Sequence, residues 1–190
     1  MTDAIPPTEH ALPSDPSTPT SLLLVNTGDG KGKSTAAFGT MLRALARGWD
    51  VAVIQFIKSG DWKSGEETIA RRLGVDWHVL GDGFSWDAED LEKSAELARD
   101  AWALVLRLLE AGDHGLLILD EITYPMNWDW IDTDEVVAAL EARPAHVNVV
   151  ATGRDAPQPL IDLADTVTEM KVVKHAFKDQ GIKAQKGIEL

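Results

Sequence analysis

Short apolar runs alternate with longer mixed stretches along residues 21–190 of the chain. Apolar runs of about four to eight residues, bounded by turn-forming residues, are typical of strands buried on both faces of a parallel sheet. A weaker sixth run, Val167–Val173, is interrupted by Glu169 and Lys171. The five clearer runs, each predicted to be a strand, are Leu22–Val25, Val51–Ile57, Val75–Leu80, Leu116–Leu119 and Val147–Ala151.

Helical patterns lie between these runs, at Lys33–Arg47, Ser64–Leu73, Ala88–Ala111, Thr133–Glu141 and Gln158–Leu163. Asp87 stands before an acidic first turn, and Asp132 or Thr133 can cap the fourth helix. Alternation of strand and helix predicts an α/β fold, a mainly parallel sheet with helices on both faces. We expect ligands to bind beyond the carboxyl ends of the strands.

Residues 1–20 have a different composition from the rest of the chain. They hold five of the nine prolines, with serine and threonine between them. Such a segment has too little apolar surface to fold alone, so we expect a mobile tail; ordering over a ligand or a partner subunit is the alternative. Residues 21–190 are then expected to form a single nucleotide-binding domain.

The net charge and the lack of cysteine argue against several classes of function. The formal net charge is −13, which disfavours broad nucleic-acid binding and means that an anionic ligand needs a local positive site. The chain has no cysteine, so thiolate metal sites and cysteine nucleophiles are excluded. No stretch reads as a membrane span or a secretory signal, and we expect a cytoplasmic protein.

The segment Thr27–Thr35 reads TGDGKGKST and lies between a predicted strand and a predicted helix. Backbone amides of such a glycine-rich turn cradle nucleotide phosphates. We expect Lys33 to contact phosphate oxygens and Ser34 to coordinate Mg²⁺. Thr35 supplies a second hydroxyl next to Ser34. The pattern is unusual because three residues, rather than the common four, separate Gly28 from the Gly-Lys-Ser. The nucleotide-binding candidates are Thr27, Gly28, Asp29, Gly30, Lys31, Gly32, Lys33, Ser34, Thr35 and Arg154.

A second element supports the loop. Leu116–Glu121 is an apolar strand ending in Asp120 and Glu121, where nucleotide-binding folds place the acid that holds Mg²⁺. We expect Ser34, Asp120 and Glu121 to form the metal site; a helix-capping pair is the less favoured alternative for the two acids. The loop and this strand together predict the phosphate-loop NTPase (RecA-like) architecture. Arg154 follows the fifth strand and can hold phosphate bidentately, or pair with a surface acid. Lys31 either contacts phosphate or is a solvated loop cation.

An evident general base is missing. The five histidines, His10, His78, His114, His146 and His175, are scattered, and each is more typical of a packing or surface residue. His175, beside Lys174, is the most plausible exception. Either Glu121 activates a water molecule, or the co-substrate is itself a strong nucleophile.

The motifs together resemble the ATP:cob(I)alamin (corrinoid) adenosyltransferases of bacterial cobalamin biosynthesis. The resemblance covers nearly all of residues 21–190, and the short phosphate loop and the C-terminal GIKAQKGIE are its most specific parts. The matching segments are TGDGKGKSTAAFG (27–39), VIQFIKSG (53–60), GDGFSW (81–86), ILDEITY (118–124), ATGR (151–154), LADTVTEM (163–170), and VKHAF with GIKAQKGIE (173–189).

The resemblance implies an unusual use of ATP. In the family, the cobalt of cob(I)alamin, or of cob(I)yrinic acid a,c-diamide, attacks C5′ of the ribose and triphosphate leaves as a unit. The nucleotide lies reversed relative to ordinary phosphate-loop enzymes, which accommodates an altered loop. A cobalt(I) nucleophile also needs no base, so Lys33, Mg²⁺ and the loop amides act by positioning and charge stabilisation.

Two aromatic residues gain a role from the resemblance. Phe84 and Trp86 alone are more typical of packing than of a flat ligand platform. Matching aromatics in the family, however, lie against the corrin and displace its lower axial ligand. The implied catalytic set is Lys33, Glu121, Phe84 and Trp86. Packing remains the interpretation for Trp62, Trp128 and Trp130, and Gln55 and Lys58 are expected at the ligand edge.

Two other functions remain open at this point. An ordinary ATPase or kinase would use Glu121 to orient water or a hydroxyl and would release ADP. A nucleotide-gated corrinoid carrier would bind both ligands without turnover. The resemblance further implies a homodimer and a reduced flavoprotein as electron donor.

Overall fold

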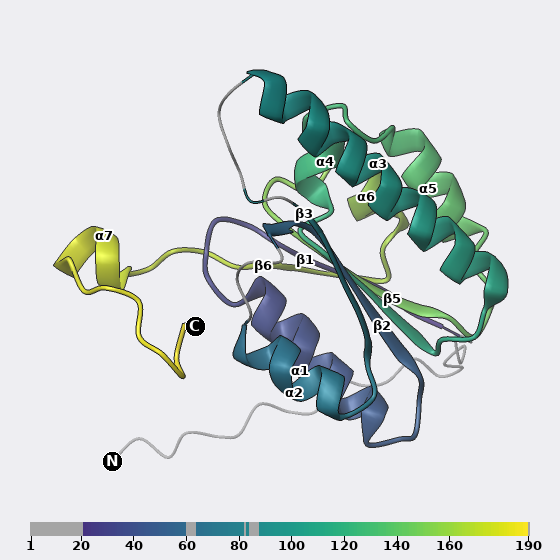
Figure 1. Cartoon of the computed structure of the whole chain (residues 1–190), viewed down its shortest axis with the longest axis horizontal. Helices are drawn as coiled ribbons and strands as arrows, with labels where there is room; N and C mark the ends of the chain where they lie inside the picture. Colours follow the sequence, from purple (N-terminus) through teal and green to yellow (C-terminus); the bar gives the residue numbers. More distant parts are fainter. Residues whose placement is uncertain (1–20, 60–63, 82, 84–87, 190) are drawn as a thin grey trace, which may run out of the picture.

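The structure is a computed structural model that describes residues 21–59, 64–81, 83 and 88–189. Within them the chain forms one six-stranded sheet in the order β3-β2-β4-β5-β1-β6 (Figure 1). All five neighbouring pairs are parallel. The strands are β1 Leu23–Thr27, β2 Val51–Ser59, β3 Asp76–Gly81, β4 Leu116–Asp120, β5 Asn148–Thr152 and β6 Thr166–Glu169.

Helices cover both faces of the sheet, as the alternation predicted (Figure 1). α1 Lys33–Leu45 and α2 Gly65–Arg72 pack on one face, where Phe38 and Met41 meet Trp77 and Ile118 in one apolar cluster. The other face packs against α3 Ala88–Ala111, α5 Thr133–Glu141 and α6 Gln158–Leu163 in a second, larger cluster. Two short helices, α4 Thr123–Asn127 and α7 Ala176–Gln180, complete the fold. The expected α/β class is confirmed.

Local capping fixes where two helices begin. Ser64 accepts a hydrogen bond from the Glu67 amide at the start of α2. Asp132 Oδ1 accepts from the amides of Asp134 (2.8 Å) and Glu135 (3.0 Å), so Asp132 rather than Thr133 caps α5. Asp87 lies outside the described residues.

The sixth strand is shorter than predicted. β6 ends at Glu169, whereas the apolar pattern continued to Val173. The difference has a physical cause: from Met170 the chain leaves the sheet and crosses the nucleotide loop, with the Met170 amide bonded to Thr27 O at 2.8 Å. α4 and α7 were not predicted, because each has only five residues and α4 contains Pro125. Among the described helices none has the length and apolarity of a membrane span.

Candidate functional site

The carboxyl ends of the central strands open onto a cavity of about 900 Å³. This is within the size range of ligand sites. The loop between β1 and α1 forms one wall, and Glu121 after β4 and Arg154 after β5 form another. The parallel register thus brings together residues far apart in sequence. The cavity is lined by Asp29–Thr35, Phe38, Ile57, Lys58, Ser64, Glu66, Gly83, Glu121, Tyr124, Arg154, His175, Lys178, Ile188 and Glu189.

The loop holds its lysine in a defined place. Lys33 Nζ donates to the carbonyl oxygens of Gly28 (2.6 Å) and Gly30 (2.8 Å), so the ammonium closes the loop from inside. Gly32 caps α1 with φ 111°, a left-handed conformation that favours glycine. Burial, and then the nearby Arg154 charge, lower the pKa of Lys33. An anionic ligand beside this ammonium would stabilise its charged form.

Close contact with the chain after β6 explains the loop's glycines. A Cβ at Gly28 would lie 2.5 Å from Met170 O, and one at Gly30 would lie 2.7 Å from the same oxygen. The Gly30 amide donates to Met170 O at 2.7 Å, so within this structure that amide bonds to protein rather than pointing at an anion. The glycines therefore let a backbone segment approach, in addition to any role with phosphate.

Asp120 lies beneath the cavity with both carboxylate oxygens bonded to protein. Oδ2 accepts from Gln55 Nε2 (2.8 Å) and Lys58 Nζ (2.9 Å), and Oδ1 accepts from Thr152 Oγ1 (2.9 Å). The nearby Ser34 side chain also helps to lower the pKa of this carboxyl. Asp120 is 0% exposed, whereas Glu121 lines the cavity. The two adjacent acids therefore occupy different environments.

Thr152 positions both acids from the neighbouring strand. Its hydroxyl donates to Asp120 and accepts from the Glu121 amide at 3.0 Å, and the side chain is fully buried. Glu121 has φ 67°, a left-handed conformation that costs a non-glycine residue about 1 to 3 kcal/mol. The Thr152 bond therefore helps to hold Glu121 in a conformation that the isolated backbone disfavours.

The surrounding charges and burial shift the pKa values of Asp120 and Glu121 in opposite directions. Burial alone would raise the pKa of Asp120, but the Lys58 charge and the hydrogen bonds it receives lower it below the usual range. Burial, and then the Asp120 charge, raise the pKa of Glu121, although cationic neighbours oppose the shift. The ionised form of Asp120 is thus favoured and is paired with Lys58. A cation bound in the cavity would in turn favour the ionised form of Glu121.

Arg154 is held at the rim by its own backbone. Its carbonyl accepts from Thr123 Oγ1 (2.6 Å) and from Asn127 Nδ2 (3.3 Å), which ties the loop after β5 to α4. A Cβ at Gly153 would lie 2.0 Å from Thr123 Oγ1, so this position requires glycine. The guanidinium lies 3.8 Å from Asp29 across the cavity mouth, an exposed pair that an anion can displace.

The donor set suits a metal held with a nucleotide better than a free metal. Among the described residues no group of three or more histidine, cysteine or acidic side chains forms a metal cage. Mg²⁺ commonly takes only one or two protein ligands and completes its shell with water and phosphate oxygens. The Ser34 hydroxyl and the Glu121 carboxylate line the same cavity and meet that requirement.

The C-terminal segment forms a further wall that the sequence reading assigned only through its motif. Lys31 pairs with Glu189 at 3.1 Å, and Lys178 and Ile188 face the cavity. His175 lines the cavity but also caps α7, with Nδ1 accepting from the amides of Phe177 (3.2 Å) and Lys178 (3.3 Å). α7 extends away from the rest of the fold (Figure 1).

Aromatic residues divide between the described and undescribed parts of the chain. Trp128 packs between Tyr124 and Trp130, with ring centroids 5.3 and 4.7 Å apart, and Trp130 lies against the larger core cluster. Packing therefore accounts for Trp128 and Trp130, as expected. Phe84, Trp86 and Trp62 lie outside the described residues.

Comparison with known proteins identifies the family. The family described as ATP:corrinoid adenosyltransferase BtuR/CobO/CobP matches residues 20–190. The corrinoid adenosyltransferase of Pseudomonas aeruginosa is 48% identical over 170 residues, covering 88% of this chain and 83% of its own length. Corrinoid adenosyltransferase CobA of Salmonella typhimurium is 44% identical over 168 residues, covering 88% and 85% respectively. The chain therefore belongs to the ATP:corrinoid adenosyltransferase family, as its motifs predicted.

Proposed function

We propose that the chain transfers the 5′-deoxyadenosyl group of ATP to the cobalt of a reduced corrinoid, cob(I)alamin or cob(I)yrinic acid a,c-diamide. The cobalt(I) electron pair forms a bond to C5′, and the C5′–O5′ bond breaks. Triphosphate leaves with the electron pair of that bond, and the cobalt is formally oxidised to cobalt(III). Family membership supports the reaction, and the single structural observation that carries it is that the cationic side chains of Lys33, Lys58 and Arg154 line one cavity with the nucleotide loop.

The residues of the cavity have distinct parts in this proposal. Lys33 and Arg154 both line the cavity and would bind the triphosphate, stabilising the charge that builds on it as the bond breaks. Asp120 would hold Ser34 and Lys58 in place, and Thr152 would fix the Glu121 backbone. The loop residues Thr27–Thr35 would position the nucleotide so that C5′ faces the corrinoid.

Magnesium and the aromatic pair extend the proposal. Mg²⁺ bound to the nucleotide would add charge stabilisation for the leaving triphosphate, with Ser34 and Glu121 as its protein ligands. Asp120 was expected as a third ligand, but both of its carboxylate oxygens accept hydrogen bonds from protein, so its proposed part is to stabilise the site from behind Ser34. Phe84 and Trp86 would lie against the corrin and displace its lower axial ligand, which eases reduction of the cobalt. The family resemblance supports these assignments, together with a homodimer, a cytoplasmic location and a reduced flavoprotein as electron donor.

A nucleotide with an imido group between its β- and γ-phosphates tests which bond breaks. Adenosyl transfer cleaves C5′–O5′ and leaves the β–γ linkage intact, so this analogue should still adenosylate cob(I)alamin at a rate within about tenfold of that with Mg-ATP. The measurement is the appearance of the light-sensitive alkylcobalamin spectrum under anaerobic conditions. An inert analogue, with ATP yielding ADP, would instead favour an ordinary ATPase. Binding of both ligands without a cobalt–carbon bond would favour a carrier.

A further inference from the structure

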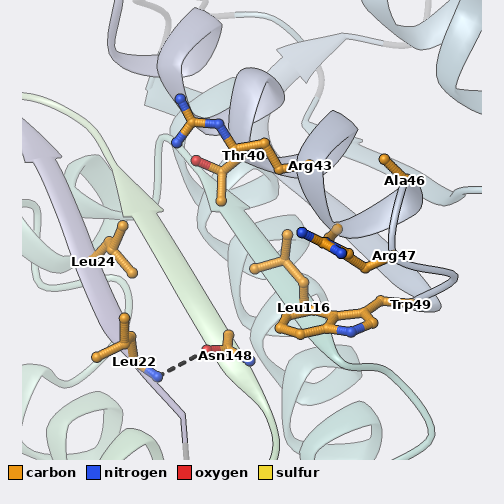
Figure 2. Close-up of a pocket in the computed structure, with 10 residues that line it drawn as sticks. Leu22, Leu24, Thr40, Arg43, Ala46, Arg47, Trp49, Leu116 and Asn148 are labelled. Atoms are coloured by element: carbon orange, nitrogen blue, oxygen red, sulfur yellow. Dashed lines mark hydrogen bonds between the residues drawn. The ribbon is translucent and has the colours of Figure 1, made fainter. Parts of the chain in front are cut away.

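A second cavity, of about 520 Å³, lies at the other end of the sheet from the nucleotide loop. We call it the α1 groove. It runs between the C-terminal half of α1 and the beginnings of β1, β4 and β5, with Trp49 at one end (Figure 2). Its lining residues are Leu22, Leu24, Thr40, Arg43, Ala44, Ala46, Arg47, Trp49, Leu116 and Asn148.

The floor of the α1 groove is apolar and partly open to solvent. Leu22 is 37% exposed and Trp49 is 44% exposed, which is high for residues of this size beside a core. The indole ring is held in place because it packs on Gly115, where an added Cβ would lie 3.3 Å from the ring. The groove thus offers a fixed aromatic face beside aliphatic side chains.

The rim of the α1 groove is positively charged. Arg43 on α1 and Arg47 just after its C-terminal end are exposed, and within the described part of the chain neither has an ion-pair partner. The chain has 31 acidic and 18 basic residues, so the two neighbouring arginines give the groove rim a charge opposite to that of the chain as a whole. They favour an occupant that is apolar and carries a negative charge.

The chain itself enters the fold at this groove. The Leu22 amide donates to Asn148 Oδ1 at 2.9 Å, the bond drawn in Figure 2, and Asn148 Nδ2 donates to Gly115 O at 3.0 Å. Leu22 is therefore fixed at the groove, and residues 1–20 are attached directly beside it. Any segment of residues 1–20 meets the groove at a high effective concentration.

The sequence of residues 1–20 has the chemistry that the groove favours. Residues 13–19 read PSDPSTP, which places Pro13, Pro16 and Pro19 three residues apart, the repeat of a polyproline II helix. In a polyproline II helix the three rings would share one face, and such helices dock on aromatic-lined grooves. Residues 1–20 contain Asp3, Glu9 and Asp15 and no lysine or arginine.

The length of the segment also fits. Pro13 is nine residues before Leu22, and nine residues of polyproline II helix span about 28 Å. The 13 residues of α1 extend over about 20 Å. The segment is therefore long enough to run along the groove from its fixed end at Leu22.

We propose that the segment Pro13–Pro19 docks in the α1 groove of its own chain. Its prolines would pack against Leu22, Leu24 and Trp49, and Asp15 would pair with Arg43 and Arg47. Docking would cover the exposed apolar floor and neutralise the arginine pair. The site is separate from the nucleotide cavity and does not depend on the proposed function.

The absence of cysteine allows a direct test in the full chain. A nitroxide is attached through Ser14→Cys, and the tryptophan indole N–H signals of the ¹⁵N-labelled chain are recorded before and after the nitroxide is reduced. Trp49→Phe identifies the Trp49 signal. We expect this signal to lose most of its intensity while the nitroxide is active, because the label lies beside the indole ring.

Charge reversal supplies the matched comparison. Arg43→Glu with Arg47→Glu should restore most of the Trp49 intensity, whereas Lys93→Glu with Arg107→Glu on the exposed face of α3 should leave the loss unchanged. Adding Asp15→Arg to the groove variant should bring the loss back. Unchanged indole positions of the other tryptophans establish that each variant is folded.

Two results would overturn the proposal. One is a Trp49 intensity that is the same in the parent chain and in the groove variant. The label would then come near Trp49 only because it is covalently attached to the same chain, and not because the segment docks. The other is the same broadening when the nitroxide is on an unlabelled chain mixed with ¹⁵N-labelled chain, which would assign the occupant to a second copy.

Discussion

Replacing Lys33 by alanine should lower the rate of Mg-ATP-dependent adenosyl transfer to cob(I)alamin by at least about a hundredfold. The ammonium is held by two loop carbonyls at 2.6 and 2.8 Å and faces the cavity, so its charge is already in place when triphosphate begins to leave. Removing one such fixed group in an enclosed site costs about 10² to 10³ in rate. The measurement is the initial rate of alkylcobalamin formation with saturating nucleotide.

The control for this variant is Lys93→Ala, which removes the same charge from an exposed position of α3. It should retain the parent rate, and both variants should unfold at nearly the parent temperature. A Lys33→Ala chain with a near-normal rate would contradict the role assigned to the loop.

Asp120→Asn should lower the free energy of unfolding by about 3 kcal/mol. The change leaves the Lys58 ammonium without its partner at 2.9 Å and puts an amide where Lys58, Gln55 and Thr152 now donate to a carboxylate. Removing one member of a buried pair costs about 3 to 5 kcal/mol, and we take the lower end because Lys58 is 34% exposed and can turn to water. Urea unfolding followed by circular dichroism measures the change.

Two comparisons isolate the cause. Asp100→Asn makes the same change on the exposed surface of α3 and should shift stability by less than about 0.5 kcal/mol. Adding Lys58→Met to Asp120→Asn should recover part of the loss, because no unpaired ammonium remains. A loss in Asp120→Asn no larger than that in Asp100→Asn would refute the buried network.

The same variant should change the response to acid. The folded state lowers the pKa of Asp120 below its ordinary value of 3.8, so the ionised carboxylate adds stability above that pH. That contribution is lost as the pH falls through the folded-state value. The parent chain should therefore lose more stability than Asp120→Asn on acidification through this range.

Patterning alone predicted most of the fold. β4 is buried along its whole length, so its apolar run is typical of a central strand and predicted the strand correctly. The two acids at the end of this run could then be placed at the ligand-binding edge of the sheet. α3 and α5 begin and end at the predicted residues, since acidic first turns and Asp132 mark their starts. Alternation also predicted that the nucleotide loop, Glu121 and Arg154 meet at one edge, because parallel strands share their carboxyl ends.

The hydrophobic pattern did not predict the side-chain contacts that depend on how neighbouring strands pair. The register of β2 on β4 pairs Gln55 with Asp120, which places Gln55 and Lys58 on the carboxylate. Thr152 reaches Asp120 because β5 lies beside β4, and nothing local in its sequence indicates a positioning role. Met170 lies on the loop glycines only because β6 pairs with β1. Such pairings depend on register, which a single sequence does not specify.

One anaerobic measurement tests the central claim most directly. The chain is mixed with Mg-ATP and chemically reduced cob(I)alamin, the visible spectrum is followed, and the phosphate products are quantified. The account predicts loss of the cob(I)alamin band, a light-sensitive alkylcobalamin, and one triphosphate released for each cobalt–carbon bond formed. ADP and phosphate without a new cobalt–carbon bond would contradict it.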